Sequence, residues 1–200
     1  CYITKDGAFS RNHKQFMNAQ HILDELVPLF AKYPHVVLDG ELYNHNYKDN
    51  FNKIISLVRK QTPSDAERNE AKVIQFHNYD IFMPIDGIDS TFRYRNKCIK
   101  KLHEEFAFQY CKTVETHEVS IIESATEWHK RFLELGYEGS ILRNNKPYEN
   151  KRSYNLQKFK DFHDTEATII GWVEGQGKRT GTIGKFLARD ANGIEFGMPV

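Results

Sequence analysis

Three carboxylates in this sequence stand where a strand-like apolar run meets a glycine. VVLDGELY carries Asp39 and Glu41 on either side of Gly40, and GYEGSILRN carries Glu138 beside Gly139. We expect Gly40 to allow a tight bend that interrupts the first strand. Carboxylates at the exit of a buried strand are costly unless they bind a cation, a ribose hydroxyl or a basic partner. These segments are therefore candidates for a metal or nucleotide site.

A pair of lysines points to an anion. In YNLQKFK the residues alternate, so Lys158 and Lys160 share one face of the expected strand while Gln157 and Phe159 share the other. Two ammonium groups on one face repel each other unless an anion lies between them, and a phosphate suits that place. Taken alone, the segment is explained equally well as an exposed strand with incidental lysines.

Composition limits the class of protein. The chain has 200 residues and a net charge of +1, with basic clusters over 93–101 and 143–152 that suit local contacts with a polyanion. Its apolar runs are too short to cross a bilayer and its start lacks a leader. Its three cysteines are odd in number and lack metal-type spacing. We expect a soluble monomer of a reducing cytoplasm, or of the host cytoplasm if the source is a virus.

Hydrophobic periodicity predicts a mixed α+β chain that ends in an all-β segment. A first helix is expected from near Phe16 to just before Pro34, and three others over 51–58, 94–108 and 126–135. Strands are expected over 35–43, 72–82, 166–173, 184–190 and 193–200. Because helical patterns stop and glycine-rich turns take over, we place a boundary at residues 161–163.

Five short motifs together are far more specific than any one of them. They are Ser10-Arg11, Asp39-Gly40-Glu41, Tyr79-Asp80, Glu138-Gly139 and Lys158-x-Lys160. Their order and separations resemble those of the covalent nucleotidyltransferases, which include DNA ligases, RNA ligases and mRNA capping enzymes. The connection KPYENKRSYNLQKFKDF and the glycine-rich basic segment EATIIGWVEGQGKRTGTIGKFLARD resemble ATP-dependent DNA ligases in particular.

This resemblance covers nearly the whole chain and implies a fold. Residues 1–161 would be an ATP-grasp-like adenylation domain, with antiparallel sheets flanked by helices and its N-terminal part missing. Residues 162–200 would be the beginning of an OB-fold β-barrel.

The resemblance also implies an activity, with ATP and Mg²⁺ as cofactors and nicked double-stranded DNA as partner. AMP passes from ATP to a lysine and then to the 5′-phosphate at a nick, after which the 3′-hydroxyl seals the strand. Such enzymes serve DNA replication, repair and recombination. Two alternatives stay open: an RNA ligase or capping guanylyltransferase, and a module that binds a nick or nucleotide without chemistry.

The resemblance assigns roles to the nucleotide site. Lys158 and Lys160 would hold the α-phosphate, and Glu138 would hold Mg²⁺ through water. Glu41 would position the ribose or assist the metal, and Tyr79 would stack on adenine. A plain core aromatic is the alternative for Tyr79.

Two neighbours of these residues are given structural roles, and the remaining roles concern phosphates. Asp39 would shape the bend and Asp80 its loop. Arg11, assisted by Ser10, would contact a phosphate of the nucleotide or of the nick. Contacts to the DNA backbone are expected from the basic loops, at Arg143, Lys151, Arg152, Lys178 and Arg179.

Lys5 does not fit the nucleophile of this family. The family motif is Lys-x-Asp-Gly-x-Arg, whereas Lys5-Asp6-Gly7 lacks the intervening residue and the arginine. We interpret Lys5 as part of a hairpin turn between CYIT and AFSR. The nucleophilic lysine is then expected just before Cys1, and this chain would not form its own adenylate.

Overall fold

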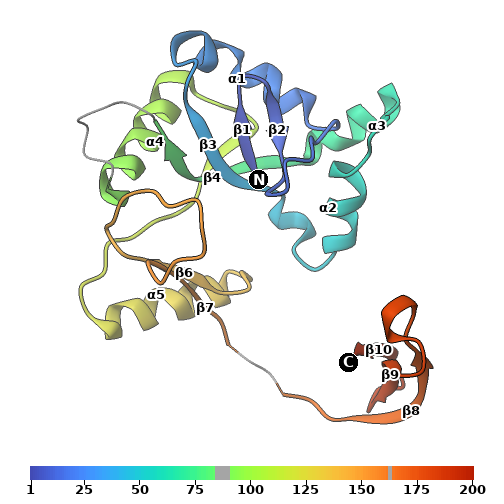
Figure 1. The fold of residues 1–200 in the computed structure, drawn as a ribbon. Coiled ribbons are helices and arrows are strands. Elements are labelled where there is room, and N and C mark those ends of the chain that lie inside the picture. The colour runs from blue at the N-terminus through green and yellow to red at the C-terminus, as the bar shows by residue number, and fades with distance from the viewer. Residues whose placement is uncertain (84–90, 162–163) are drawn as a thin grey trace. The chain divides into compact units, whose positions relative to one another are not determined.

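The computed structural model describes residues 1–83, 91–161 and 164–200. The chain divides into two compact units, residues 1–160 and residues 161–200 (Figure 1). The first unit mixes helices with two sheets and the second contains three strands. The predicted α+β class is confirmed. None of the helices in the described residues is long and apolar enough to cross a membrane.

A five-stranded sheet forms the centre of the first unit. Its order is β2-β1-β3-β4-β5. The strands are β1 (Tyr2–Thr4), β2 (Gly7–Phe9), β3 (Val37–Tyr43), β4 (Gln75–Phe82) and β5 (Cys111–Thr113). Neighbouring strands are antiparallel except that β5 runs parallel to β4. The sequence did not predict β5, because three residues are too few to show a period. The hairpin turn at Lys5, between β1 and β2, is confirmed.

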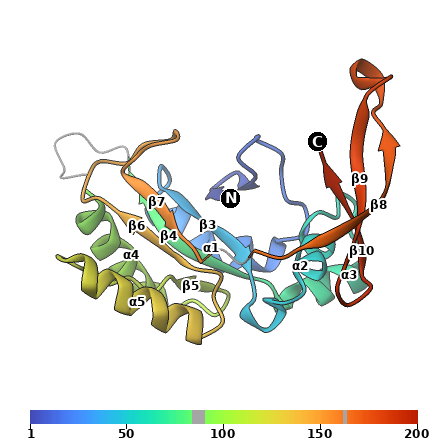
Figure 2. The same cartoon turned by 90° about the horizontal axis from the view of Figure 1, so that it is seen from below.

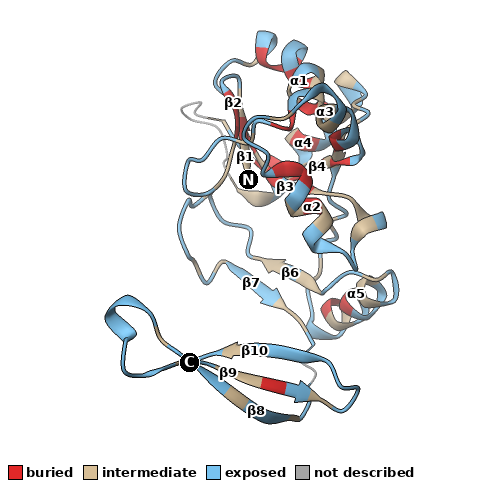
Figure 3. Cartoon of the chain, turned by 90° about the vertical axis from the view of Figure 1, so that its right-hand side faces the viewer, coloured by how far each residue is buried: buried red, intermediate tan, exposed pale blue. Residues whose placement is uncertain are grey.

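Helices bury the core against one face of this sheet. They are α1 (Gln20–Lys32), α2 (Phe51–Val58) and α4 (Phe92–Phe106), whereas α3 (Asp65–Glu70) and the 3₁₀ turn η1 (His45–Tyr47) contain no buried residue and the 3₁₀ turn η2 (Ala71–Val73) buries Ala71. Leu38 and Leu42 of β3 are buried among them, whereas Asp39 and Glu41 alternate to the opposite face. Figure 3 shows this burial as red stretches of the first unit.

Two helix starts differ from the sequence prediction. The backbone N–H of Phe16 donates to the carbonyl oxygen of Ala8 in β2. Helix α1 therefore begins at Gln20 rather than near Phe16. The polar break before β4 contains α3, whose N-cap Ser64 forms a capping box with Glu67. That pattern was readable in the sequence.

A second, two-stranded sheet lies on helix α5 (Ile122–Glu134). Strands β6 (Ser140–Arg143) and β7 (Leu156–Phe159) are antiparallel, and α5 runs along one face of the pair (Figure 2). The other face of the pair is turned away from α5.

The second unit is a three-stranded antiparallel sheet of order β10-β9-β8. It comprises β8 (Ala167–Glu174), the turn η3 (Gly177–Arg179), β9 (Ile183–Asp190) and β10 (Glu195–Pro199). Its all-β character is confirmed. Among its described residues only Ala188 is buried, and apolar side chains such as Trp172 and Ile194 are exposed.

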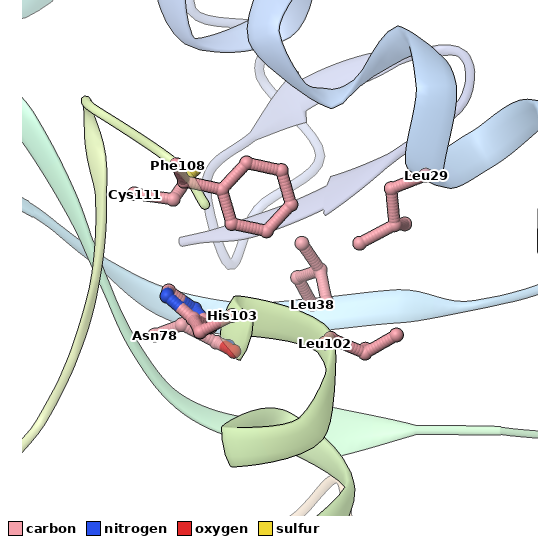
Figure 4. A pocket seen from close by; sticks show the side chains of 7 residues that line it. All are labelled: Leu29, Leu38, Asn78, Leu102, His103, Phe108 and Cys111. Carbon is pink, nitrogen blue, oxygen red and sulfur yellow. The ribbon is translucent and has the colours of Figure 1, made fainter. Parts of the chain in front are cut away.

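A narrow gap inside the first unit is apolar on most sides. Figure 4 shows its lining, Leu29, Leu38, Asn78, Leu102, His103, Phe108 and Cys111. The gap has no room for a water molecule, so it is part of the core rather than a ligand site. His103 meets the edge of Phe108 here, with ring centroids 5.2 Å apart.

Acid should destabilise the first unit through this histidine. Burial, opposed by Glu25 and reinforced by Lys112, lowers the pKa of His103. The unfolded chain then takes up the proton first, so stability is full above pH 6.5 and falls below it, by at most about 1.4 kcal/mol per pH unit. We expect urea midpoints between pH 7.5 and 5.5 to depend less on pH in His103→Gln. The exposed His35→Gln is the control; equal slopes in all three proteins would contradict this expectation.

Candidate active site

A β-bulge shapes the end of β4. Asp39 lies opposite Asp80 but Gly40 lies opposite Asn78, so Tyr79 is one residue in excess. The side-chain amide of Asn78 donates to the carbonyls of Asp39 at 2.9 Å and Asp80 at 2.7 Å. Simple alternation would direct Tyr79 and Asp80 to opposite faces, whereas here both contact Arg143.

Asp80 is the centre of a buried ion cluster. The residue is 2% exposed. Arg95 of α4 donates Nε to Oδ1 at 2.7 Å and Nη2 to Oδ2 at 3.1 Å, and Arg143 of β6 donates to Oδ2. The guanidinium of Arg143 also lies over the rings of Tyr79 and Phe92, at 5.3 and 4.8 Å from their centroids. One carboxylate thus holds α4 and β6 against β4.

Arg143 differs from its expected position. The sequence places it among exposed basic loops that contact DNA, but its side chain is 15% exposed and paired with Asp80. Its role toward DNA stays a prediction. The structure gives Asp80 a larger part than the loop contact expected for it.

Gly40 does not form the expected bend. Strand β3 continues through it from Val37 to Tyr43, so the prediction of an interrupted strand is wrong. The reason for a glycine is close packing, since an added Cβ would lie 2.5 Å from the carbonyl oxygen of His77. Cys1 lies beside it: its nitrogen donates to Gly40 O at 2.5 Å, and the Gly40 N–H donates to Cys1 O at 2.9 Å.

Asp39 and Glu41 lie on the face of β3 that is turned away from the core. Tyr79 of the neighbouring strand β4 lies beside them. Tyr148 donates its hydroxyl to Asp39 at 3.0 Å. Burial raises the pKa of Asp39, and this hydrogen bond opposes the rise. Burial also raises the pKa of Tyr79, and the charges of Asp39 and Glu41 add to it. Glu41 itself is exposed and therefore available to a ligand.

Glu138, Lys158 and Lys160 lie together at the start of β6 and the end of β7. Lys160 Nζ donates to Glu138 Oε1. This contact, with a smaller effect of Lys158, lowers the pKa of Glu138. The Glu138 side chain is 84% exposed. The structure thus brings three of the predicted site residues into one acidic and basic cluster.

The strand register shows which way these lysines face. Ile141 lies opposite Lys158 and Arg143 opposite Leu156, so Lys158 and Lys160 share their face with Arg143. Arg143, on this shared face, forms the ion pair with Asp80. The opposite face packs on α5, where the ring of His129 stacks on Phe159.

A second contact ties the two sheets together. His45, just after β3, lies with Nε2 2.9 Å from the carbonyl oxygen of Leu135, and its ring lies 4.5 Å from that of Tyr137. Tyr137 precedes Glu138. Strand β6 is therefore joined to the five-stranded sheet near both of its ends, through His45 after β3 and through Asp80 of β4.

The remaining predicted residues lie at the surface. Ser10 Oγ accepts the backbone N–H of Lys14 at 3.1 Å, and Arg11 is exposed in the same turn. Lys151 pairs with Glu149 at 3.2 Å beside the exposed Arg152. In the second unit Lys178 and Arg179 are exposed, and Arg179 donates to Val200 O at 2.7 Å.

One small cavity adjoins the site. It has a volume of about 80 Å³ and lies between Asp39, Asp80, Arg95 and the loop 144–156. This volume suits a few waters rather than a nucleotide. Within residues 1–83, 91–161 and 164–200, no group of three or more His, Cys, Asp or Glu could hold a metal ion.

The arrangement of motifs matches a known family. The model of the ATP-dependent DNA ligase domain matches residues 5–160. This chain belongs to that family. The DNA ligase of African swine fever virus (strain Badajoz 1971 Vero-adapted) is 28% identical over 183 residues, covering 88% of this chain and 41% of the viral protein. The DNA ligase of Enterobacteria phage T4 is 26% identical over 200 residues, covering 81% and 41%.

Solved ligase structures share the fold. A structure of Lig E DNA ligases has a TM-score of 0.78 at 23% identity and covers all of this chain and 72% of that one. The ATP complex of the bacteriophage T7 ATP-dependent DNA ligase has a TM-score of 0.59 at 17% identity, covering 99% and 70%. The chain spans 41% of the length of each of the two relatives named above.

Sequence reasoning missed Arg95 and Tyr148. Arg95 had a signal, because it shares a helical stripe with the buried Ile99 and Leu102. A charge on a buried stripe needs a buried partner. Tyr148 had no comparable signal, since its partner Asp39 lies 109 residues away.

Removing the Asp80 charge should loosen the first unit. Asp80→Asn leaves Arg95 and Arg143 without their carboxylate, and we expect a loss of about 3–5 kcal/mol in the free energy of unfolding. Urea unfolding measures it. The matched control is Asp49→Asn, which breaks an exposed pair with Lys48 and should cost less than about 1 kcal/mol. Equal losses for the two variants would contradict the buried cluster.

Proposed function

We propose that the protein containing this chain is an ATP-dependent DNA ligase, and that residues 1–160 are its adenylation domain. Family membership supports the class of reaction. The observation that carries the proposal is the cluster of Glu138, Lys158 and Lys160 on the face that Arg143 turns toward Tyr79. Cations on that face would meet a nucleotide that rests on β3 and β4.

The lysines would act on phosphate. Lys158 and Lys160 would stabilise the charge that grows on nonbridging oxygens as AMP moves from ATP to lysine and on to the 5′-phosphate. In this structure Lys160 forms an ion pair with Glu138, which supports the proposal that its ammonium would hold an anionic oxygen. A bound phosphate would compete with Glu138 for it.

Glu41 and Glu138 would hold Mg²⁺ only together with water and substrate phosphate. Mg²⁺ usually keeps several waters and binds one or two carboxylates together with substrate phosphates. Both carboxylates are exposed and neither belongs to a larger acidic group in the described residues. The donor set therefore fits a metal held largely by water and phosphate, with Glu41 also free to contact ribose.

Tyr79 would stack on adenine. Its ring is half-buried and Arg143 covers one side, so the base would use the other side. An aromatic ring fixed in this way offers a rigid stacking surface.

The nucleophile would precede Cys1. The nitrogen of Cys1 lies against Gly40, between Asp39 and Glu41, so a residue directly upstream would enter beside the proposed ribose site. Lys5 lies in the exposed turn after β1 and would not take this role.

DNA would meet exposed cations. Candidates are Arg11, Lys151, Arg152, Lys178 and Arg179. The hydroxyl of Ser10 would assist Arg11, and Arg143 would contribute only if it leaves Asp80. Residues 162–200 would begin an OB-fold, and the exposed apolar side chains of their strands would pack against the remaining strands of that fold. We place the enzyme, as a monomer, in DNA replication, repair and recombination, in the host cytoplasm if it is viral.

Loss of either lysine or of Glu138 should stop the reaction without unfolding the domain. In the full-length protein, Lys158→Ala, Lys160→Ala and Glu138→Ala should lower sealing of a labelled nick by on the order of a hundredfold or more. Lys130→Ala, which changes an exposed lysine of α5, is the control. Wild-type sealing by any of the three variants would remove that residue from the site.

The choice of substrate separates the alternatives. Wild-type protein should become covalently labelled by ATP with label on the α-phosphate, and should seal nicked DNA. Labelling by GTP instead would indicate a capping enzyme, and sealing of nicked RNA alone would indicate an RNA ligase. Absence of any label would favour a binding module.

Salt dependence tests the DNA contacts of the second unit. Arg179→Ala should weaken binding of the full-length protein to nicked DNA and reduce the slope of log K against log salt by about 0.9. Lys32→Ala, which breaks an exposed pair with Glu105, should leave the slope as it is. An unchanged slope in Arg179→Ala would exclude this residue from the DNA contacts.

A further inference from the structure

We propose that His129, a buried histidine of α5, is a positioning residue that sets the geometry of the lysine pair. The inference rests on the proposed function, because it concerns how Lys158 and Lys160 reach a phosphate. His129 lies outside the five motifs named in the sequence and on the face of β6 and β7 opposite to Lys158 and Lys160.

His129 holds β6 through a hydrogen bond. The residue is 3% exposed, and its Nδ1 lies 3.0 Å from the hydroxyl oxygen of Ser140. Ser140 is the first residue of β6 and follows Glu138 by two positions. A buried polar ring that hydrogen-bonds a strand residue fixes that strand more precisely than apolar contact alone, because the bond is directional.

The same ring holds β7 by stacking. The His129 and Phe159 rings lie 4.0 Å apart, nearly parallel at 17°. Phe159 stands between Lys158 and Lys160 and points to the opposite face. A shift of Phe159 along or across the sheet therefore moves both ammonium groups.

These two contacts meet at one register pair. Ser140 lies opposite Phe159, so His129 touches both members of a single cross-strand pair. The two chain segments approach closely next to this pair, because a Cβ added to Gly139 would lie 2.4 Å from the carbonyl oxygen of Phe159. A two-stranded sheet has few other constraints on register. His129 thus supplies a lock on β6 and β7 next to the predicted chemistry.

The expected consequence concerns the rate more than ATP binding. Displacing a charge-stabilising group by about 1 Å costs on the order of a hundredfold in rate. The lysines act most strongly as charge grows in the transition state, whereas Tyr79 and Glu41, on the other sheet, keep their contacts with the base and ribose. Loosening His129 should lower the adenylation rate constant and change the half-saturating ATP concentration much less.

The test measures single-turnover self-labelling of the full-length protein by ATP. His129→Phe keeps the stack on Phe159 and loses the bond to Ser140. We expect its rate at saturating ATP to fall by about tenfold or more. Ser140→Ala should lose a similar factor, and the double variant should be no slower than His129→Phe, because both changes break the same contact. His129→Asn, which can keep a bond to Ser140 but loses the stack on Phe159, should also label more slowly than the wild-type protein.

A matched destabilised variant separates position from stability. Leu102→Ala removes core packing in α4 and should lower the melting temperature yet label at the wild-type rate while folded. The inference is overturned if His129→Phe labels at the wild-type rate, if the two single effects multiply in the double variant, or if Leu102→Ala slows labelling equally. Failure of the wild-type protein itself to label would instead overturn the proposed function.

Discussion

The organisation of the first unit depends on one buried carboxylate. Asp80 would be expensive to bury alone, and the structure compensates it with Arg95 from a helix and Arg143 from the second sheet. Three segments far apart in sequence are thereby held at one point. Because an Arg–carboxylate pair is directional, the contact orients the segments as well as joining them.

Two sheets divide the chemistry of the candidate site. The five-stranded sheet presents the carboxylate of Glu41 and the ring of Tyr79, which suit a nucleoside, while the two-stranded sheet presents Lys158 and Lys160, which suit phosphate. The bulge at Tyr79 lets neighbouring residues of one strand both meet Arg143. A regular strand would have directed one of them into the core.

Most elements and candidate residues were readable from local pattern. Alternation predicted the shared face of Lys158 and Lys160, and turn chemistry predicted the hairpin at Lys5. Local pattern failed where a distant partner decides the outcome: Gly40 is required by the closeness of β4 rather than by a turn, and Arg143 is drawn from the exposed surface by Asp80.

The sequence by itself determined the α+β class, the order of the motifs and the family that they indicate, because these depend on periodicity and on residue types along the chain. Only the tertiary structure decided that Glu138 contacts Lys160, that Asp80 gathers two arginines, and that His129 lies beneath the lysine strand. These contacts depend on strand register and on a bulge, which arise when distant segments pack and leave no periodic trace in either segment.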